Sequence, residues 1–287
     1  MNSVPVHFVD DGPTDAPVVV LSGSLGSDLR MWDPQVAPLL EAGLRVVRYD
    51  HRGHGGTPVP DPGPCTLDEL GADVLALLDR LGIERAHFVG LSLGGMVGMW
   101  LGQHTPQRLR TLTLCCTSVD LAGTGVYGDR ARLVAEQGVA VVAEAVVQRW
   151  FTPEWRAGNP SSTAAFEQMV AAVSAGGYAA CCRAIETMDL ASRLGDITTP
   201  VLILAGDRDQ ATPPPHARRL ATAIPDARLE FLAPAAHLAN VEQPTALTRA
   251  VLSHIGSNAA ALATSGTHEP DGRTAPRPPV ASPTWCR

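Results

Sequence analysis

The stretch AHFVGLSLGG, residues 86–95, decides the fold. Residues Ala86–Val89 predict a buried strand, and the glycine-rich part leads into an apolar helix that ends near Gln103. Between strand and helix, GLSLG (residues 90–94) fits the pattern G-x-S-x-G. A sharp strand-to-helix turn needs small flanking residues, and it exposes the serine hydroxyl at the carboxyl edge of the sheet, where open α/β sheets bind their ligands. Ser92 is therefore the candidate nucleophile.

Strands and helices alternate on both sides of this turn. Short apolar runs bounded by glycine, proline and aspartate predict strands, and amphipathic stretches predict helices. The expected strands are Val4–Val9, Pro17–Leu21, Leu44–Tyr49, Leu109–Cys115, Pro200–Ala205 and Arg228–Leu232, and the further expected helices are Leu67–Leu81, His216–Ala223 and Thr245–His254. This alternation predicts an α/β fold with a doubly wound, mostly parallel sheet.

The middle of the chain has a different pattern. Arg132–Trp150 predicts one helix, Ser162–Met188 predicts one or two more, and no convincing buried strand lies near them. The end of the chain is rich in Pro, Ser, Thr, Ala and Gly without periodicity, as in a disordered tail or linker. The predicted division is a core of residues 1–119 and 196–255, a helical cap of residues 120–195 and a tail of residues 256–287.

The composition limits the class of protein. The chain has 287 residues, of which 45% are hydrophobic, and a formal net charge of −7. This apolar fraction is too high for a mostly disordered chain. No apolar run approaches the roughly 18 residues that a membrane span needs, and the N-terminus lacks the basic start and apolar stretch of a secretory signal. The negative charge disfavours nucleic acids and anionic membranes as partners.

The six cysteines form two adjacent pairs and two single positions. This spacing matches neither a zinc site nor a CxxC redox motif. We therefore expect the cysteines to serve as small buried hydrophobic residues in a protein of the reducing cytoplasm.

A serine nucleophile needs a base that a third group orients, and on this fold the order along the chain is serine, acid, histidine. His237 lies in the loop after Arg228–Leu232, so it combines this order with the carboxyl edge of the sheet. Asp207 and Asp209 follow the preceding strand and compete for the orienting role. We favour Asp209, deeper in its loop, and expect Asp207 to organise the loop backbone.

Two backbone N–H groups should stabilise the oxyanion that forms during attack on a carbonyl group. One belongs to Leu93, which follows the serine. The other should come from the loop Gly23–Gly26, where Leu25 is the favoured donor. The turn Asp50–Gly55 contains two histidines, and we interpret it as a structural turn rather than as part of the catalytic machinery.

Six stretches carry a resemblance to a known family: LSGSLGSD (21–28), MWDPQ (31–35), GLSLGGMVG (90–98), RWFT (149–152), CCRAI (181–185) and MDL (188–190). Over Val4–His254 the chain resembles the α/β-hydrolase superfamily, and these stretches are similar to the 3-oxoadipate enol-lactonases of the β-ketoadipate pathway. The resemblance implies a serine hydrolase with the triad Ser92, Asp209 and His237. It also implies that the enzyme opens a small anionic lactone, 3-oxoadipate enol-lactone, through an acyl-enzyme.

The free carboxylate of such a lactone needs a counter-charge or hydrogen-bond donors. Arg149 or Arg183 of the cap could supply it, with Trp150 as an apolar wall. The alternative for each arginine is a solvated position on the surface. The reaction needs neither a metal nor an organic cofactor.

The resemblance has departures and rivals. Gly23 stands where such loops commonly carry Asn or His. Some relatives are fused to a carboxymuconolactone decarboxylase domain, which implies a functional link between the two activities. Residues 256–287 are too few to form that domain. The sequence leaves open whether the protein forms a homo-oligomer. Ser92 speaks against haloalkane dehalogenases and epoxide hydrolases, which need Asp there. A cofactor-free carboxylesterase or perhydrolase shares the triad, and a catalytically silent binding protein is the alternative of another class.

Overall fold

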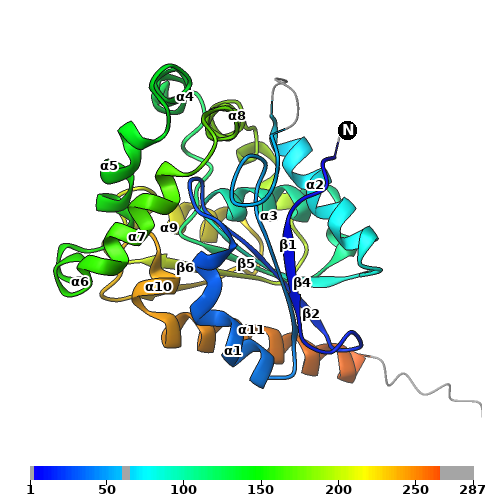
Figure 1. Cartoon of the computed structure of the whole chain (residues 1–287). Helices are drawn as coiled ribbons and strands as arrows, with labels where there is room; N and C mark the ends of the chain where they lie inside the picture. The colour runs from blue at the N-terminus through cyan, green and yellow to red at the C-terminus, as the bar shows by residue number, and fades with distance from the viewer. Residues whose placement is uncertain (1–2, 60–64, 266–287) are drawn as a thin grey trace, which may run out of the picture.

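The strands form one sheet in the order β1-β3-β2-β4-β5-β6-β7 (Figure 1). They are β1 (Phe8–Asp11), β2 (Val18–Ser22), β3 (Arg45–Tyr49), β4 (Ala86–Leu91), β5 (Leu109–Cys115), β6 (Val201–Gly206) and β7 (Arg228–Leu232). β1 is antiparallel to β3, and every other neighbouring pair is parallel. The computed structural model describes residues 3–59 and 65–265, with side chains up to residue 258. The predicted doubly wound, mostly parallel sheet is confirmed.

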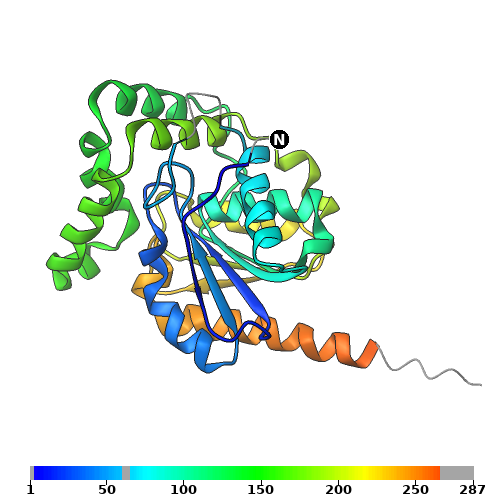
Figure 2. The same cartoon turned by 45° about the vertical axis from the view of Figure 1, so that its right-hand side comes forward.

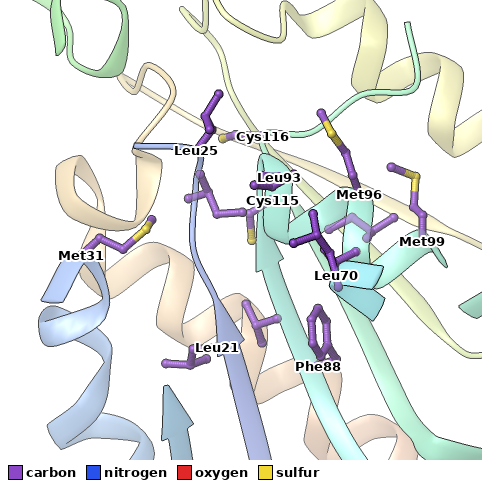
Figure 3. Packing of buried hydrophobic residues seen from close by; sticks show 14 of the residues in the cluster. Leu21, Leu25, Met31, Leu70, Phe88, Leu93, Met96, Met99, Cys115 and Cys116 are labelled. Carbon is purple, nitrogen blue, oxygen red and sulfur yellow. The ribbon is translucent and has the colours of Figure 1, made fainter. Parts of the chain in front are cut away.

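Helices cover both faces of the sheet (Figure 1 and Figure 2). One face carries α1 (Asp33–Glu41) and α11 (Pro244–Ser265), and the other carries α2 (Leu67–Arg80), α3 (Leu93–His104) and α9 (Pro214–Ala223). Because both faces are covered, β2, β4 and β6 are buried at every position, which explains their continuous apolar sequences. Figure 3 shows part of this core, where Leu21 and Phe88 of the sheet belong to one cluster with Leu70 and Met96 of the helices.

The start of α2 follows directly from its sequence. The Thr66 hydroxyl accepts a hydrogen bond from the Glu69 N–H, and the Glu69 carboxylate accepts one from the Thr66 N–H. This reciprocal capping satisfies backbone donors that the first helical turn leaves free. The helix predicted over Leu67–Leu81 is confirmed.

The first strand differs from the prediction. The sequence predicts a strand at Val4–Val9, but β1 begins four residues later. The His7 N–H donates to the Thr57 hydroxyl at 2.8 Å instead of to a neighbouring strand. Within β1, the Asp10 carboxylate forms an ion pair with Arg45 of β3 at 2.6 Å. Hydrogen bonds and ion pairs of side chains therefore determine where this edge strand begins, and the alternation of apolar residues contains no information about them.

The helical insertion between β5 and β6 is also confirmed, with one correction. Its helices are α4 (Val126–Gln137), α5 (Ala140–Trp150), α6 (Pro153–Gly158), α7 (Pro160–Ala171) and α8 (Ala175–Glu186), and residues 116–200 contain no strand. The single helix predicted over Arg132–Trp150 is wrong, because Gly138 adopts a φ of +83° and ends α4 there. We call α4–α8 the cap; the predicted boundaries between cap and core stay a prediction.

The last helix is longer than the sequence indicated. α11 continues through residues 256–265, which were expected to belong to the tail. The rest of the predicted tail, residues 266–287, lies outside the described residues. The shorter elements are η1 (Leu29–Trp32), η2 (Pro106–Arg108), η3 (Ala191–Asp196) and α10 (Ala239–Glu242). Among the described residues, no helix combines the length and the apolarity that crossing a bilayer requires.

Candidate active site

Ser92 occupies the turn between β4 and α3. Its φ of +58° and ψ of −111° lie in a region that residues other than glycine rarely adopt. The Ser92 N–H donates to the Cys115 carbonyl at 2.9 Å, and the Ser92 carbonyl accepts a hydrogen bond from the Thr117 hydroxyl at 2.7 Å. These bonds hold the strained turn in place. The Ser92 hydroxyl caps no helix N–H and faces the cavity described below.

The flanking glycines are required because backbone atoms approach them closely. A Cβ atom at Gly90 would lie 2.1 Å from the Gly94 carbonyl oxygen, and one at Gly94 would lie 2.2 Å from the Ser22 carbonyl oxygen. Neither contact can be relieved by rotating a side chain. The G-x-S-x-G pattern is therefore a packing requirement of the turn that presents Ser92.

His237 and Asp209 form a buried hydrogen-bonded pair. The His237 Nδ1 donates to the Asp209 Oδ2 at 2.8 Å. The carboxylate also accepts hydrogen bonds from the Ala211 N–H, the Thr212 N–H and the Thr212 hydroxyl. Burial disfavours the charged carboxylate, but His237 and the Thr212 hydrogen bonds outweigh burial and lower the pKa of Asp209. When the Nδ1–H of the imidazole donates to Asp209, the other ring nitrogen, Nε2, carries no proton in the neutral form and can accept a hydrogen bond.

The two competing aspartates have separate positions. Asp207 is exposed, and its Oδ1 accepts a hydrogen bond from the Ala235 N–H at 2.9 Å. Asp207 thus ties its own loop to the loop that carries His237, whereas Asp209 contacts the imidazole itself. Asp209 therefore has the contact that the orienting role requires, and the roles of the two aspartates stay predictions.

The two predicted oxyanion donors are free. In the loop after β2, the Ser24 N–H donates to the Met31 sulfur at 3.3 Å and the Gly26 N–H donates to the His54 Nε2 at 3.0 Å. The Leu25 N–H between them, and the Leu93 N–H at the first position of α3, donate no hydrogen bond within the described part of the chain. Both are available to a ligand oxygen.

The turn after β3 supports this loop. His54 accepts the Gly26 N–H through Nε2 and donates through Nδ1 to the Arg52 carbonyl, and the His51 Nε2 lies 3.0 Å from the Gly23 carbonyl oxygen. Burial, then the nearby His54, lowers the pKa of His51 to about 3. Both imidazoles therefore support the loop as neutral hydrogen-bonding groups, which agrees with the structural interpretation of this turn. A Cβ atom at Gly23 would lie 2.9 Å from the Ser27 hydroxyl oxygen, so a larger residue there would require side chains such as Ser27 to move.

A cavity of about 170 Å³ lies between the core and the cap. Ser24, Leu25, Ser92, Gln210, Ala211 and His237 line it from the core, and Leu121, Thr124, Val126, Tyr127, Arg130, Val146, Arg149, Trp150 and Tyr178 line it from the cap side. The candidate nucleophile and base thus share one cavity with two of the three cap residues predicted to contact the substrate. The lining contains two arginines and, among the described residues, no Asp or Glu.

One predicted cap residue is not brought to the site. Arg183 lies on α8 with its side chain exposed, and it does not line the cavity. Its neighbours Cys182 and Ala184 are buried, so the face of α8 that meets the rest of the protein excludes it. The second cavity arginine is instead Arg130 of α4, which the sequence analysis missed. The sequence contains only a weak indication of this role, because Arg130 precedes the predicted helix Arg132–Trp150.

No group of three or more His, Cys, Asp and Glu in the described residues is arranged to hold a metal ion. The described cysteines are all free and buried, namely Cys65, Cys115, Cys116, Cys181 and Cys182, and Cys286 lies outside the described residues.

The sequence profile of the family described as "alpha/beta hydrolase fold" matches residues 16–244, and the chain belongs to this family. It is a carboxylic ester hydrolase, similar to the 3-oxoadipate enol-lactonases. The 3-oxoadipate enol-lactonase 2 of Acinetobacter baylyi is 38% identical over 248 residues, which are 86% of this chain and 92% of that protein.

Solved structures give the same relationship. The enol-lactonase from Burkholderia xenovorans LB400 superposes with a TM-score of 0.84 and 39% identity, covering 88% of this chain and 96% of that one. A thermophilic esterase from Thermogutta terrifontis, solved with malate bound, has a TM-score of 0.82 and 27% identity, covering 88% and 93%.

Proposed function

We propose that this hydrolase opens 3-oxoadipate enol-lactone to 3-oxoadipate in the catabolism of aromatic compounds. The observation that carries the proposal is the shared cavity: Ser92 and His237, which is hydrogen-bonded to Asp209 outside the lining, face it together with two arginines and, among the described residues, no Asp or Glu. A lactone with a free carboxylate matches both the hydrolytic groups and the local positive charge. The similarity to enol-lactonases supports the same substrate.

In the first step, the Ser92 oxygen attacks the lactone carbonyl carbon while the His237 Nε2 takes the hydroxyl proton. The negative charge that develops on the carbonyl oxygen is stabilised by the Leu25 and Leu93 N–H groups. The ring C–O bond then breaks and releases an enolate, which is a far better leaving group than an alkoxide. The His237 imidazolium gives the proton that it took from Ser92 to the enolate, which becomes the ketone; His237 is then neutral again, and the acyl group remains on Ser92.

In the second step, water cleaves the acyl-enzyme. His237 takes a proton from the water as its oxygen attacks the ester carbonyl, and the same two N–H groups stabilise the second oxyanion. His237 returns the proton to Ser92, and the dicarboxylate product leaves. Asp209 keeps the Nδ1 proton of His237 in place and stabilises the imidazolium that forms in both steps.

The cap supplies the contacts to the remainder of the substrate. Arg149 is half-buried at the cavity, and Trp150, which is buried, forms an apolar wall. A guanidinium group is suited to a planar carboxylate because it donates two parallel hydrogen bonds. The substrate carboxylate would therefore bind near Arg149 and the second cavity arginine, Arg130.

The cellular setting follows from the same proposal. The free, buried cysteines suit a reducing compartment, so we assign the enzyme to the cytoplasm. A functional link to a carboxymuconolactone decarboxylase, whose product would be this lactone, belongs to the same proposal.

The test is ultraviolet-monitored hydrolysis of 3-oxoadipate enol-lactone by the full chain, by Ser92→Ala and by Ser161→Ala. We expect fast loss of the enol chromophore with the wild type, and a fall of about 10⁴-fold or more with Ser92→Ala. Ser161 is exposed on α7, and its alanine variant should keep wild-type activity. Hydrolysis of simple aryl esters without any lactone opening would contradict the substrate while leaving the class of enzyme intact. Lactone opening that survives Ser92→Ala would contradict the mechanism.

A further inference from the structure

Among the described residues, the Tyr178 hydroxyl is a buried polar group whose proton has no acceptor. Tyr178 lies in α8 with a relative exposure of 0%, and it lines the cavity. Within the described part of the chain the hydroxyl has no close hydrogen-bond partner; the Arg130 guanidinium interacts with it, but that group can only donate, so the hydroxyl proton has no acceptor. Burial raises the pKa of Tyr178, so the hydroxyl is neutral and able to donate. A buried donor without an acceptor is unfavourable, so a ligand oxygen that accepts this proton gains a hydrogen bond that the protein alone does not make.

The position of the Tyr178 ring is fixed by contacts with the core. The ring stacks on His54, with centroids 6.4 Å apart and planes at 22°. A Cβ atom added to Gly26 would lie 3.3 Å from the Tyr178 Cε2, so the ring packs directly against the loop that carries the Leu25 N–H. The hydroxyl is therefore held in one place rather than free to find another partner.

Arg130 presents an unneutralised charge to the same cavity. Its guanidinium carbon lies 5.0 Å from the centre of the Tyr127 ring, one helical turn away on α4. The side chains that contribute most to its electrostatic environment are Tyr178, Tyr127 and Cys182, and none of these is a carboxylate. Burial, then the charge of Arg130, lowers the pKa of Arg149, which means that the two guanidinium groups repel one another. A bound anion would remove that repulsion.

We infer that Arg130 and the Tyr178 hydroxyl together form the subsite that selects substrates with a free carboxylate. This inference rests on the proposed function and deepens it: the substrates are lactones or half-esters of dicarboxylic acids, and their neutral counterparts are disfavoured. The guanidinium group neutralises the carboxylate, and the tyrosine hydroxyl donates to one of its oxygens. Tyr178 is a specificity-determining residue in this scheme and takes no part in bond breaking.

The experiment measures binding without turnover. In the full-length Ser92→Ala protein, isothermal titration calorimetry compares monomethyl glutarate, which has one carboxylate, with dimethyl glutarate, which has none. Adding Tyr178→Phe should weaken monomethyl glutarate binding by about 10-fold or more and leave dimethyl glutarate unchanged. Arg130→Gln should have at least as large an effect on the half-ester. Arg132→Gln is the matched control, because Arg132 is exposed on the same helix and pairs with Asp129, and it should bind like the parent protein.

The outcomes separate this inference from the proposed function. If the wild type opens the lactone but Tyr178→Phe binds the half-ester normally, the subsite is wrong and the proposed function stands. If the lactone is not opened but half-ester binding depends on Tyr178, the subsite stands and the proposed substrate falls. Equal weakening of half-ester and diester would reduce Tyr178 to a packing role and overturn the inference. The melting temperature of each variant identifies any loss that comes from misfolding.

Discussion

The core side and the cap side of the cavity differ in how far their polar groups are paired within the protein. On the core side, Asp209 accepts hydrogen bonds from His237 and from its own loop, and the Gly26 N–H is held by His54. On the cap side, among the described residues, Arg130 interacts with tyrosines and forms no ion pair with a carboxylate, and the proton of the Tyr178 hydroxyl has no acceptor. Groups that react are thus fixed in advance, as electrostatic preorganisation requires. Groups that recognise the substrate keep their hydrogen-bonding capacity for it.

The largest effect should come from breaking the prepared pair on the core side. Asp209→Asn keeps the size of the side chain but favours the wrong imidazole tautomer, so kcat should fall by about 10³–10⁴-fold. Asp207→Asn is the matched control two residues away, where only a backbone contact to Ala235 is weakened. Its kcat should stay close to that of the wild type. Equal losses in the two variants would contradict the assignment of Asp209 as the orienting acid.

The next largest effect concerns the backbone that carries Ser92. Gly94→Ala places a methyl group 2.2 Å from the Ser22 carbonyl oxygen, and neither atom belongs to a flexible side chain. The free energy of unfolding should drop by about 3 kcal/mol or more, measured by urea denaturation. Gly158→Ala meets nothing within 4 Å and should change the stability little. A stable Gly94→Ala protein would show that the turn is less tightly packed than described.

On the cap side, the loss should appear in substrate binding rather than in turnover. Arg149→Ala removes a charge at the cavity and should raise KM for the anionic lactone by about 10-fold, with a smaller change in kcat. Arg183→Ala removes an exposed charge from α8 and should leave both constants unchanged. A larger rise in KM for Arg183→Ala than for Arg149→Ala, measured by steady-state kinetics, would contradict the finding that Arg183 lies outside the cavity.

The last prediction is a pH dependence on the core side, which is absent near neutral pH and develops only in acid. The pKa of His51 is about 3 in the folded protein and 6.5 in an unfolded chain. As the pH falls below 6.5 the unfolded chain binds this proton first, so folding stability is lost down to about pH 3, by at most about 1.4 kcal/mol per pH unit from this residue. His51→Gln should show a shallower loss in denaturation measured between pH 4 and 7. Parallel curves for the two proteins would mean that His51 is already charged when folded.

Much of the core side was predictable because its information is local. The turn at Ser92 is encoded by glycines next to it, and the order of Ser92, Asp209 and His237 along a parallel sheet brings them to one edge. The strand Leu109–Cys115 was predicted with the bounds that the structure has. The first strand was misplaced because the ion pair between Asp10 and Arg45 joins residues far apart in the chain.

The cap side was decided only by the tertiary structure. A helical arginine has the same local sequence signature whether it faces solvent, like Arg183, or a cavity, like Arg130. The choice depends on how α4 and α8 pack on each other and on the core, and side-chain contacts between distant residues set that packing. For the same reason no pattern along the chain could reveal that the Tyr178 hydroxyl is buried with no acceptor for its proton among the described residues. The sequence by itself determined the chemistry of the site, and the packing of the cap determined which side chains are left to recognise the substrate.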